Sequence, residues 1–156
     1  MTAIAEFKKQ RELDKQEFRH KIVEFEDKVS GLPMSIKGDI PNTITNHFVD
    51  GAYVREMFAP KGYCVITKIH KKTHPFFVMS GEVSVMTENG YVRVKAPYWG
   101  ITKAGTKRIC YMHTDSVWIT VHATNETDID KIEDEVIAKS YDDFEKGCRE
   151  IKGGQV

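Results

Sequence analysis

The sequence of 156 residues lacks the features that mark several large classes of protein. No run approaches the ~20 apolar residues that a membrane-spanning helix needs, and the first nine residues have no apolar core of the kind found in secretory signals. We therefore expect an intracellular, cytoplasmic protein with no membrane partner. The apolar content of 40%, with eight Phe and six Tyr residues, excludes a low-complexity disordered chain.

Cysteine is scarce, and its placement excludes further classes of site. The three residues Cys64, Cys110 and Cys148 include no Cys-x-x-Cys pair, so we expect neither a disulfide framework nor a thiolate zinc site. The sequence also lacks a Gly-x-Ser-x-Gly motif and a glycine-rich phosphate-binding loop. These absences argue against a hydrolase built on a nucleophile elbow and against a P-loop nucleotide site.

Net charge is absent as well, because 23 basic side chains balance 23 acidic ones. This neutrality is a cancellation between segments, since residues 31–110 carry a net charge of +6 and residues 111–156 carry −6. If the protein has a charged partner, we therefore predict that it binds the basic segment, residues 31–110. We do not expect nucleic acid as that partner, because the acidic segment would oppose its binding.

Helices are predicted at both ends of the chain. Residues 1–31 predict an amphipathic helix that ends at Gly31 and Pro33. Its narrow apolar stripe is expected to pack on the chain's own domain or on a second copy. The stripe consists of Phe18, Ile22, Phe25 and Val29. Residues 126–150 predict an acidic C-terminal helix, in which early acids suit the positive end of the helix dipole.

Residues 45–125, between the predicted helices, indicate an all-β domain. Eight short runs rich in β-branched and aromatic residues alternate with Gly and Pro, at a spacing of roughly 8–12 residues. The runs are Tyr53–Phe58, Tyr63–His70, Phe76–Met79, Val83–Thr87, Tyr91–Lys95, Tyr98–Thr102, Ile109–Met112 and Val117–His122. Residues 32–52 are predicted to be mostly irregular, and Asn89-Gly90 predicts a tight hairpin with positive φ at both residues. These patterns predict a small antiparallel sandwich or barrel.

The order of residues around two histidines resembles the first motif of the cupin superfamily. Gly62 is followed by His70-x-x-x-His74, six residues and then Gly81. The register set by Gly81 places His74 at the family's Glu, His70 at its second His and Lys68 at its first His. The segment from Lys103 to Arg108 resembles the second motif, with Arg108 at the His position. Residues 47–140 as a whole resemble small cupin-like proteins of bacteriophage and prophage genomes.

The resemblance implies an all-β core: a small cupin (jelly-roll) β-barrel with flanking N-terminal and C-terminal α-helices and a pocket at one end. It also implies a homodimer or higher homo-oligomer, located in the host cell cytoplasm if the protein is phage-encoded. His70 and His74 are the expected ligands of one divalent transition metal: Fe, Mn, Ni or Zn. A catalytic ion usually has three protein ligands. His113 and His122 are both candidates for the third.

Lys68 and Arg108 are cations at positions where the family has metal ligands, and this difference predicts another chemistry. Alternate residues of a strand point the same way, so Lys68 is expected to share a face with His70. With His74 and Arg108 these side chains would form a pocket for a small anion such as a carboxylate or phosphate. The aromatic residues Tyr53 and Trp99 are expected to line the same pocket.

These patterns lead to one main prediction of function and three alternatives. The main prediction is a cupin-like protein that binds or sequesters a small anionic ligand, either a metabolite or a signalling nucleotide. The first alternative is a metal-dependent lyase, isomerase or oxygenase that uses His70 and His74. The second is a structural or assembly oligomer of a phage. In the third, the two histidines are structural residues whose polar atoms are satisfied by their neighbours.

Overall fold

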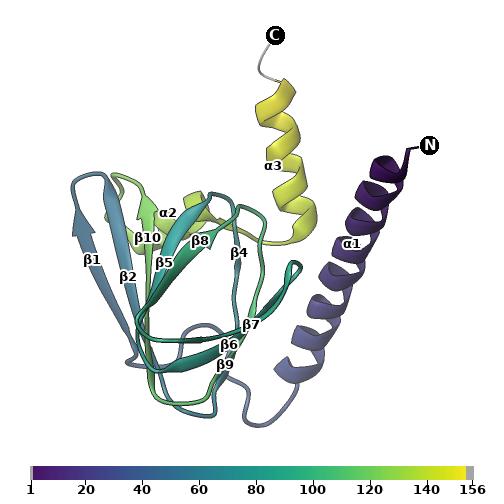
Figure 1. Ribbon diagram of the computed structural model, residues 1–156. Coiled ribbons are helices and arrows are strands. Elements are labelled where there is room, and N and C mark those ends of the chain that lie inside the picture. The colour runs from purple at the N-terminus through teal and green to yellow at the C-terminus, as the bar shows by residue number, and fades with distance from the viewer. Residues whose placement is uncertain (1, 154–156) are drawn as a thin grey trace.

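The computed structural model describes residues 2–153, and the side chains of residues 2–150. Three helices flank or follow a β-rich body (Figure 1), which confirms the predicted all-β core with flanking helices. The elements are α1 (Ala3–Ser30), β1 (Ile44–Val49), β2 (Ala52–Ala59), β3 (Cys64–Ile66), β4 (Ile69–His70), β5 (His74–Ser80), β6 (Glu82–Thr87), β7 (Gly90–Lys95), β8 (Tyr98–Thr102), β9 (Ile109–Met112), β10 (Ser116–Ala123), α2 (Ile129–Val136), β11 (Ile137–Ala138) and α3 (Tyr141–Gly153).

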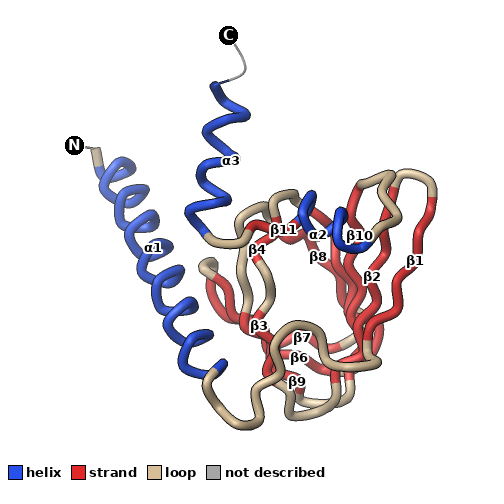
Figure 2. Tube along the Cα trace, turned by 180° about the vertical axis from the view of Figure 1, so that it is seen from behind, coloured by secondary structure: helices blue, strands red, loops and turns tan. Residues whose placement is uncertain are grey.

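The strands form two large antiparallel sheets that enclose the centre of the body (Figure 2). One sheet has the order β1-β2-β10-β5-β8 and the other the order β3-β9-β6-β7, while β4 pairs with β11. To compare this topology with a jelly roll, we leave out β1 and β11, count β3 and β4 as one interrupted strand, and renumber the strands from β2 to β10 as 1 to 8. The two sheets then have the strand orders 1-8-3-6 and 2-7-4-5. This order is compatible with a jelly roll. In the described chain no strand pairing joins the two large sheets, so the predicted closed barrel is an open sandwich instead.

The hydrophobic core lies between the two large sheets. Along β5 the side chains of His74, Phe76 and Val78 point inward and are buried, and the residues between them are more exposed. This alternation is what a strand with one buried face requires. The buried core residues are Ala59, Phe76, Val78, Val83, Val85, Val94, Cys110, Met112 and Trp118.

Two predictions about the segments between the runs are corrected by the structure. Residues 32–52, predicted to be irregular, contain β1, which pairs with β2 along its whole length. The hairpin between β6 and β7 has Glu88 and Asn89 as its two loop residues, since Thr87 pairs with Gly90. Of the Asn89-Gly90 pair only Gly90 has a positive φ, of 119°.

The acidic segment 126–150, predicted as one helix, folds as α2, β11 and α3. Asp128 caps α2, because its side chain accepts hydrogen bonds from the backbone N–H groups of Asp130 and Lys131. The chain then becomes extended at Ile137, where pairing with β4 sets Ile137 opposite His70. The tertiary pairing with β4 therefore ends the helix, and it also fixes the backbone that carries His70.

The acids of α2 pair with lysines of the basic segment. Lys68 lies 2.5 Å from Glu133, and Lys72 lies 2.5 Å from Glu135. Lys71 donates from Nζ to the backbone carbonyl of Asp134 at 2.8 Å. The opposite charges of the two segments are thus partly neutralised within the chain itself.

Helix α1 docks on the body through its C-terminal half. Ile22 is 2% exposed, whereas Phe25, of the same predicted stripe, is 39% exposed. Arg19 donates to Glu88 at 2.9 Å and to Glu145 at 3.0 Å, and these contacts join α1 to the β6–β7 hairpin and to α3. Within residues 2–153, no helix combines the length and apolar character that crossing a membrane requires.

Candidate metal centre

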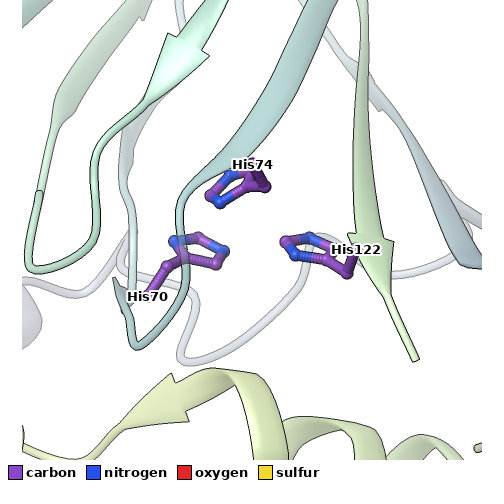
Figure 3. A group of neighbouring side chains, drawn as sticks. All are labelled: His70, His74 and His122. Carbon is purple, nitrogen blue, oxygen red and sulfur yellow. The ribbon is translucent and has the colours of Figure 1, made fainter.

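Three histidines from three different strands converge inside the sandwich. His70 ends β4, His74 begins β5 and His122 lies near the end of β10, and Figure 3 shows their rings facing one another. The ring centroid of His74 lies 4.3 Å from that of His70 and 4.5 Å from that of His122. One ring nitrogen from each residue lies within 4.8 Å of the other two. The cluster has the residue type and the spacing of a metal site.

The strand pairing explains why these three residues meet. Residues 71–73 form a short turn that returns the chain from β4 to β5, so His70 and His74 lie close together. Strands β10 and β5 are neighbours, with Thr120 opposite Phe76. Continued by two residues, that register sets His122 opposite His74, and both side chains point inward because residues two apart share a face.

Burial keeps all three imidazoles neutral at neutral pH. Burial, followed by the charges of His74, His122, Arg108 and Arg55, lowers the pKa of His70 to about 2. Burial, followed by His74 and Arg55, lowers the pKa of His122 to about 4. Burial and Arg108 also lower the pKa of His74, against an opposing hydrogen bond to a backbone carbonyl. A neutral imidazole keeps one nitrogen lone pair, which is what a metal ligand must offer.

Hydrogen bonds to the protein hold two of the rings. Nδ1 of His74 lies 3.1 Å from the backbone carbonyl of Lys72, so Nδ1–H donates to that oxygen and Nε2 carries the lone pair. Nε2 of His122 lies 3.1 Å from Oγ1 of Thr120. Contacts of this kind orient ligand imidazoles in metal sites. The site therefore contains hydrogen-bond partners that orient two of the candidate ligands, as well as the ligands themselves.

The three histidines line a cavity of about 1150 Å³ that lies between the sheets and is also lined by residues of the segment 32–42. Tyr53 also lines this cavity. Its hydroxyl donates to Oδ1 of Asn46 at 2.6 Å, and its ring stacks on that of His122 with centroids 6.0 Å apart. Helix α2 packs against Tyr53 through Ile132 and Val136, and so closes this end of the sandwich.

Arg108 places a buried cation in the lining of the same cavity. It is 7% exposed, and burial lowers its pKa. Nη2 donates to Oγ1 of Thr102, and the guanidinium carbon lies 4.5 Å from the centroid of the Phe76 ring. Among the described side chains no carboxylate forms an ion pair with Arg108. Its remaining donors are available to an anion inside the cavity.

Lys68 lines the same cavity but is exposed and paired with Glu133. It falls in the break between β3 and β4, so it does not share a strand face with His70. Two other residues, one predicted for the site and one considered for it, lie elsewhere. Trp99 is on the outer face of β8, 64% exposed, and does not line the cavity. His113 follows the end of β9, where its Nε2 is 2.7 Å from Oγ of Ser84 on the other sheet. The third histidine is therefore His122.

The residues present fit a transition-metal ion. Imidazole ligands suit Zn, Fe, Ni and Cu, and three protein ligands leave coordination positions for water or substrate. Two nitrogens bound to one ion at about 2.1 Å can be no more than about 4.2 Å apart. The nitrogens here lie within 4.8 Å of one another. Small rotations of the rings would therefore bring all three within binding distance of a single ion.

No family model and no curated protein matches the sequence. Three solved structures illustrate the similarity in backbone, each with a TM-score below 0.5. A cupin-2 domain protein from Shewanella frigidimarina has 11% identity and a TM-score of 0.45, covering 64% of this chain and 92% of its own. An acetylacetone dioxygenase from Acinetobacter johnsonii has 15% identity and a TM-score of 0.46, covering 59% and 74%. A putative ethanolamine utilization protein from Salmonella typhimurium has 13% identity and a TM-score of 0.47, covering 57% and 79%.

Proposed function

We propose that this chain is a cupin-like protein that binds one divalent transition-metal ion through His70, His74 and His122. We further propose that Arg108 holds a small anionic ligand beside that ion. The observation that supports this most strongly is the convergence of three imidazoles in one cavity. The motif around His70 and His74 and the jelly-roll order of the strands are consistent with it. A phage origin, self-association and a cytoplasmic location remain predictions from the sequence.

The charges in the cavity favour an anionic ligand. A divalent ion held by three neutral imidazoles keeps its full charge, and Arg108 adds another positive charge nearby. A buried charge without a partner is costly, so the cavity is stabilised when an anion enters. A carboxylate fits this place well, because one group can accept hydrogen bonds from a guanidinium and bind a metal ion.

Catalysis is the second candidate function, and the number of histidines favours it. Structural zinc sites use four protein ligands, whereas sites with three leave a position for a reacting group. When bound, such an ion supplies Lewis-acid polarisation of a ligand oxygen. Arg108 would orient the anionic end of the substrate, while Phe76 and Trp118 hold the guanidinium between the sheets. A metal-dependent lyase, isomerase or oxygenase would use these features.

Metal binding can be tested on protein purified without a histidine tag. We expect about one equivalent of metal by mass spectrometry of the digested protein, either as purified or after titration of the apoprotein with Fe(II), Mn, Ni or Zn. His122→Ala removes one ligand and should weaken metal binding by more than about 100-fold. Loss of a residue that only hydrogen-bonds to a ligand already lowers metal affinity by about 10- to 100-fold. His47→Ala, at an exposed histidine, is the control. Absence of stoichiometric metal, or an unchanged His122→Ala variant, would contradict the proposal.

The anion site can be tested separately on the metal-loaded protein, with oxalate and inorganic phosphate as probes in calorimetry. Arg108→Met keeps most of the side-chain volume and removes the charge. We expect it to weaken binding of the preferred probe by about 10- to 100-fold, the usual cost of losing hydrogen bonds to a charged group. Arg93→Met, at an exposed arginine, should leave binding unchanged. Equal binding by both variants would rule out this role for Arg108.

A further inference from the structure

The inner face of the five-stranded sheet presents three successive rows of side chains to the cavity. Inward residues lie two apart along a strand, so neighbouring rows are about 6.5 Å apart. The first row contains two of the three candidate metal ligands. In the second row Arg55 lies opposite Thr120, and in the third row Met57 lies opposite both Ile44 and Trp118. All five of these side chains line the cavity, so its wall changes in character from row to row.

Arg108 lies at the level of the first two rows. Its Nη2 donates to Oγ1 of Thr102, which is opposite His74 of the first row. Its guanidinium carbon lies 4.5 Å from the ring centroid of Phe76, which is opposite Thr120 of the second row. An anionic group held by Arg108 is therefore placed beside the histidines.

Arg55, the other cation of the second row, does not compete for that anionic group. Its guanidinium forms an ion pair with Asp39 of the segment 32–42. Arg108 has no carboxylate partner of this kind among the described side chains. The anionic end of a ligand is therefore expected at Arg108.

The third row is apolar, and the facing sheet continues it. Val65 of β3 lies opposite the buried Cys110, so both side chains point inward. Met57 and Val65 pack against the core but are only partly buried, and both line the cavity. The ring centroid of Trp118 lies 5.8 Å from the guanidinium carbon of Arg108. An apolar group in this place, next to the anion site, would be removed from water.

The cavity is also larger than a small polar anion needs. Its volume is about 1150 Å³, and sites for small organic molecules usually have about 300–1,000 Å³. Oxalate or phosphate at Arg108 would leave the apolar side chains of Met57, Val65 and Trp118 without a ligand group to contact. The lining therefore suits a ligand that has an apolar part as well as an anionic group.

We propose that the ligand of this site is a carboxylate with an apolar body of several carbon atoms. Its carboxylate lies at Arg108, and its body lies against Met57, Val65 and Trp118. This inference rests on the proposed anion site and names the class of ligand that the site takes. A nucleotide or a sugar phosphate would place hydroxyl groups against the apolar row, where they would lose water without gaining hydrogen bonds.

A series of saturated acids tests this assignment by titration calorimetry of the metal-loaded protein. We expect the affinity to rise about 10-fold from butyrate to hexanoate, which is the gain from burying two methylene groups, and to rise further with octanoate. The heat-capacity change on binding should become more negative along the series, since it reports burial of apolar surface. Hexanol has the same body without the carboxylate and should bind at least about 10-fold more weakly than hexanoate.

Two matched variants locate the apolar body. Met57→Gln keeps the length of the side chain and places an amide in the third row, whereas Met86→Gln makes the same change on β6, where Met86 is 43% exposed. We expect the affinity ratio of hexanoate to butyrate to fall from about 10 to about 2 in Met57→Gln and to stay unchanged in Met86→Gln. Arg108→Met should weaken binding of both acids by the same factor and leave the ratio unchanged.

The affinity ratio also separates the apolar subsite from the metal and anion site. The metal ion would contact only the carboxylate end, so the ratio should be the same in metal-loaded and metal-free protein. If oxalate binding depends on Arg108 but affinity does not rise from butyrate to octanoate, the apolar subsite is overturned and the anion site stands. If none of these acids binds, and neither oxalate nor phosphate binds, both sites are overturned. A Met57→Gln variant with the wild-type ratio would overturn the apolar subsite alone.

Discussion

Acid should destabilise the metal-free protein well above the pH range in which carboxylates titrate. The perturbation is a change from pH 7.5 to pH 5.0 in the presence of a chelator. The pKa of His70 is lowered to about 2 and that of His122 to about 4, chiefly by burial. An unfolded histidine has a pKa of about 6.5. Below that pH the unfolded chain binds protons that the folded chain does not bind, so acid favours unfolding.

The size of the effect follows from the two pKa values. A pH of 5 lies about 1.5 units below the pKa of an unfolded histidine, and each unit corresponds to about 1.36 kcal/mol. Both folded-state values lie below pH 5, so His70 and His122 each lower the free energy of unfolding by about 2 kcal/mol. The expected loss of about 4 kcal/mol is a large share of the 5–15 kcal/mol typical of a domain.

Urea titrations at the two pH values measure this loss. The variant His122→Phe removes one of the two groups and keeps an aromatic ring against Tyr53. It should lose about 2 kcal/mol less than the wild type over the same pH interval, because one site of proton uptake on unfolding is gone. If the wild type and His122→Phe lose equal stability, the imidazole of His122 is not buried and neutral in the folded protein.

Two further predictions concern the attachment of α1 and the buried thiol. Arg19→Met should lower the free energy of unfolding by about 2 kcal/mol in urea titrations, because it leaves the buried carboxylate of Glu88 with the longer 3.8 Å contact to the more exposed Lys15. Lys15→Met, the control, should cost under about 0.5 kcal/mol, and equal losses would refute this role of Arg19. Burial raises the pKa of Cys110 to about 12, so iodoacetamide at pH 8 should modify the exposed Cys64 and leave Cys110 intact until the chain unfolds. Peptide mapping that finds the two thiols equally modified would contradict the buried position of Cys110.

The strands were largely predictable because their signal is local. Each predicted run in residues 53–122 overlaps at least one strand, since β-branched residues alternate with glycine and proline punctuation. Strand β1 was missed because Thr45, Asn46 and His47 interrupt its apolar pattern, and its pairing with β2 is a tertiary contact. The break between α2 and α3 was missed for the same reason: it depends on Ile137 pairing with His70.

The candidate site was partly predictable from the sequence. His70 and His74 are close in the chain, so a short turn between them is enough to bring them together. His122 is 48 residues beyond His74 and reaches it only through the pairing of β10 with β5. Lys68 lines the cavity from an exposed position, and the expected strand face shared with His70 does not form, because the chain leaves the strand between Ile66 and Ile69. The sequence offered both His113 and His122 as the third ligand, and the choice between them depends on which strand pairs with β5.

The most direct test of the metal centre is anomalous scattering from crystals of the metal-loaded wild-type protein. Data collected above and below the absorption edge of the added metal locate the ion independently of any assumption about its ligands. We expect one strong peak, with nitrogen atoms of His70, His74 and His122 each about 2.0–2.1 Å from it. A peak at other residues, or no peak in crystals soaked with Zn, Ni, Mn or Fe(II), would contradict the proposed metal centre.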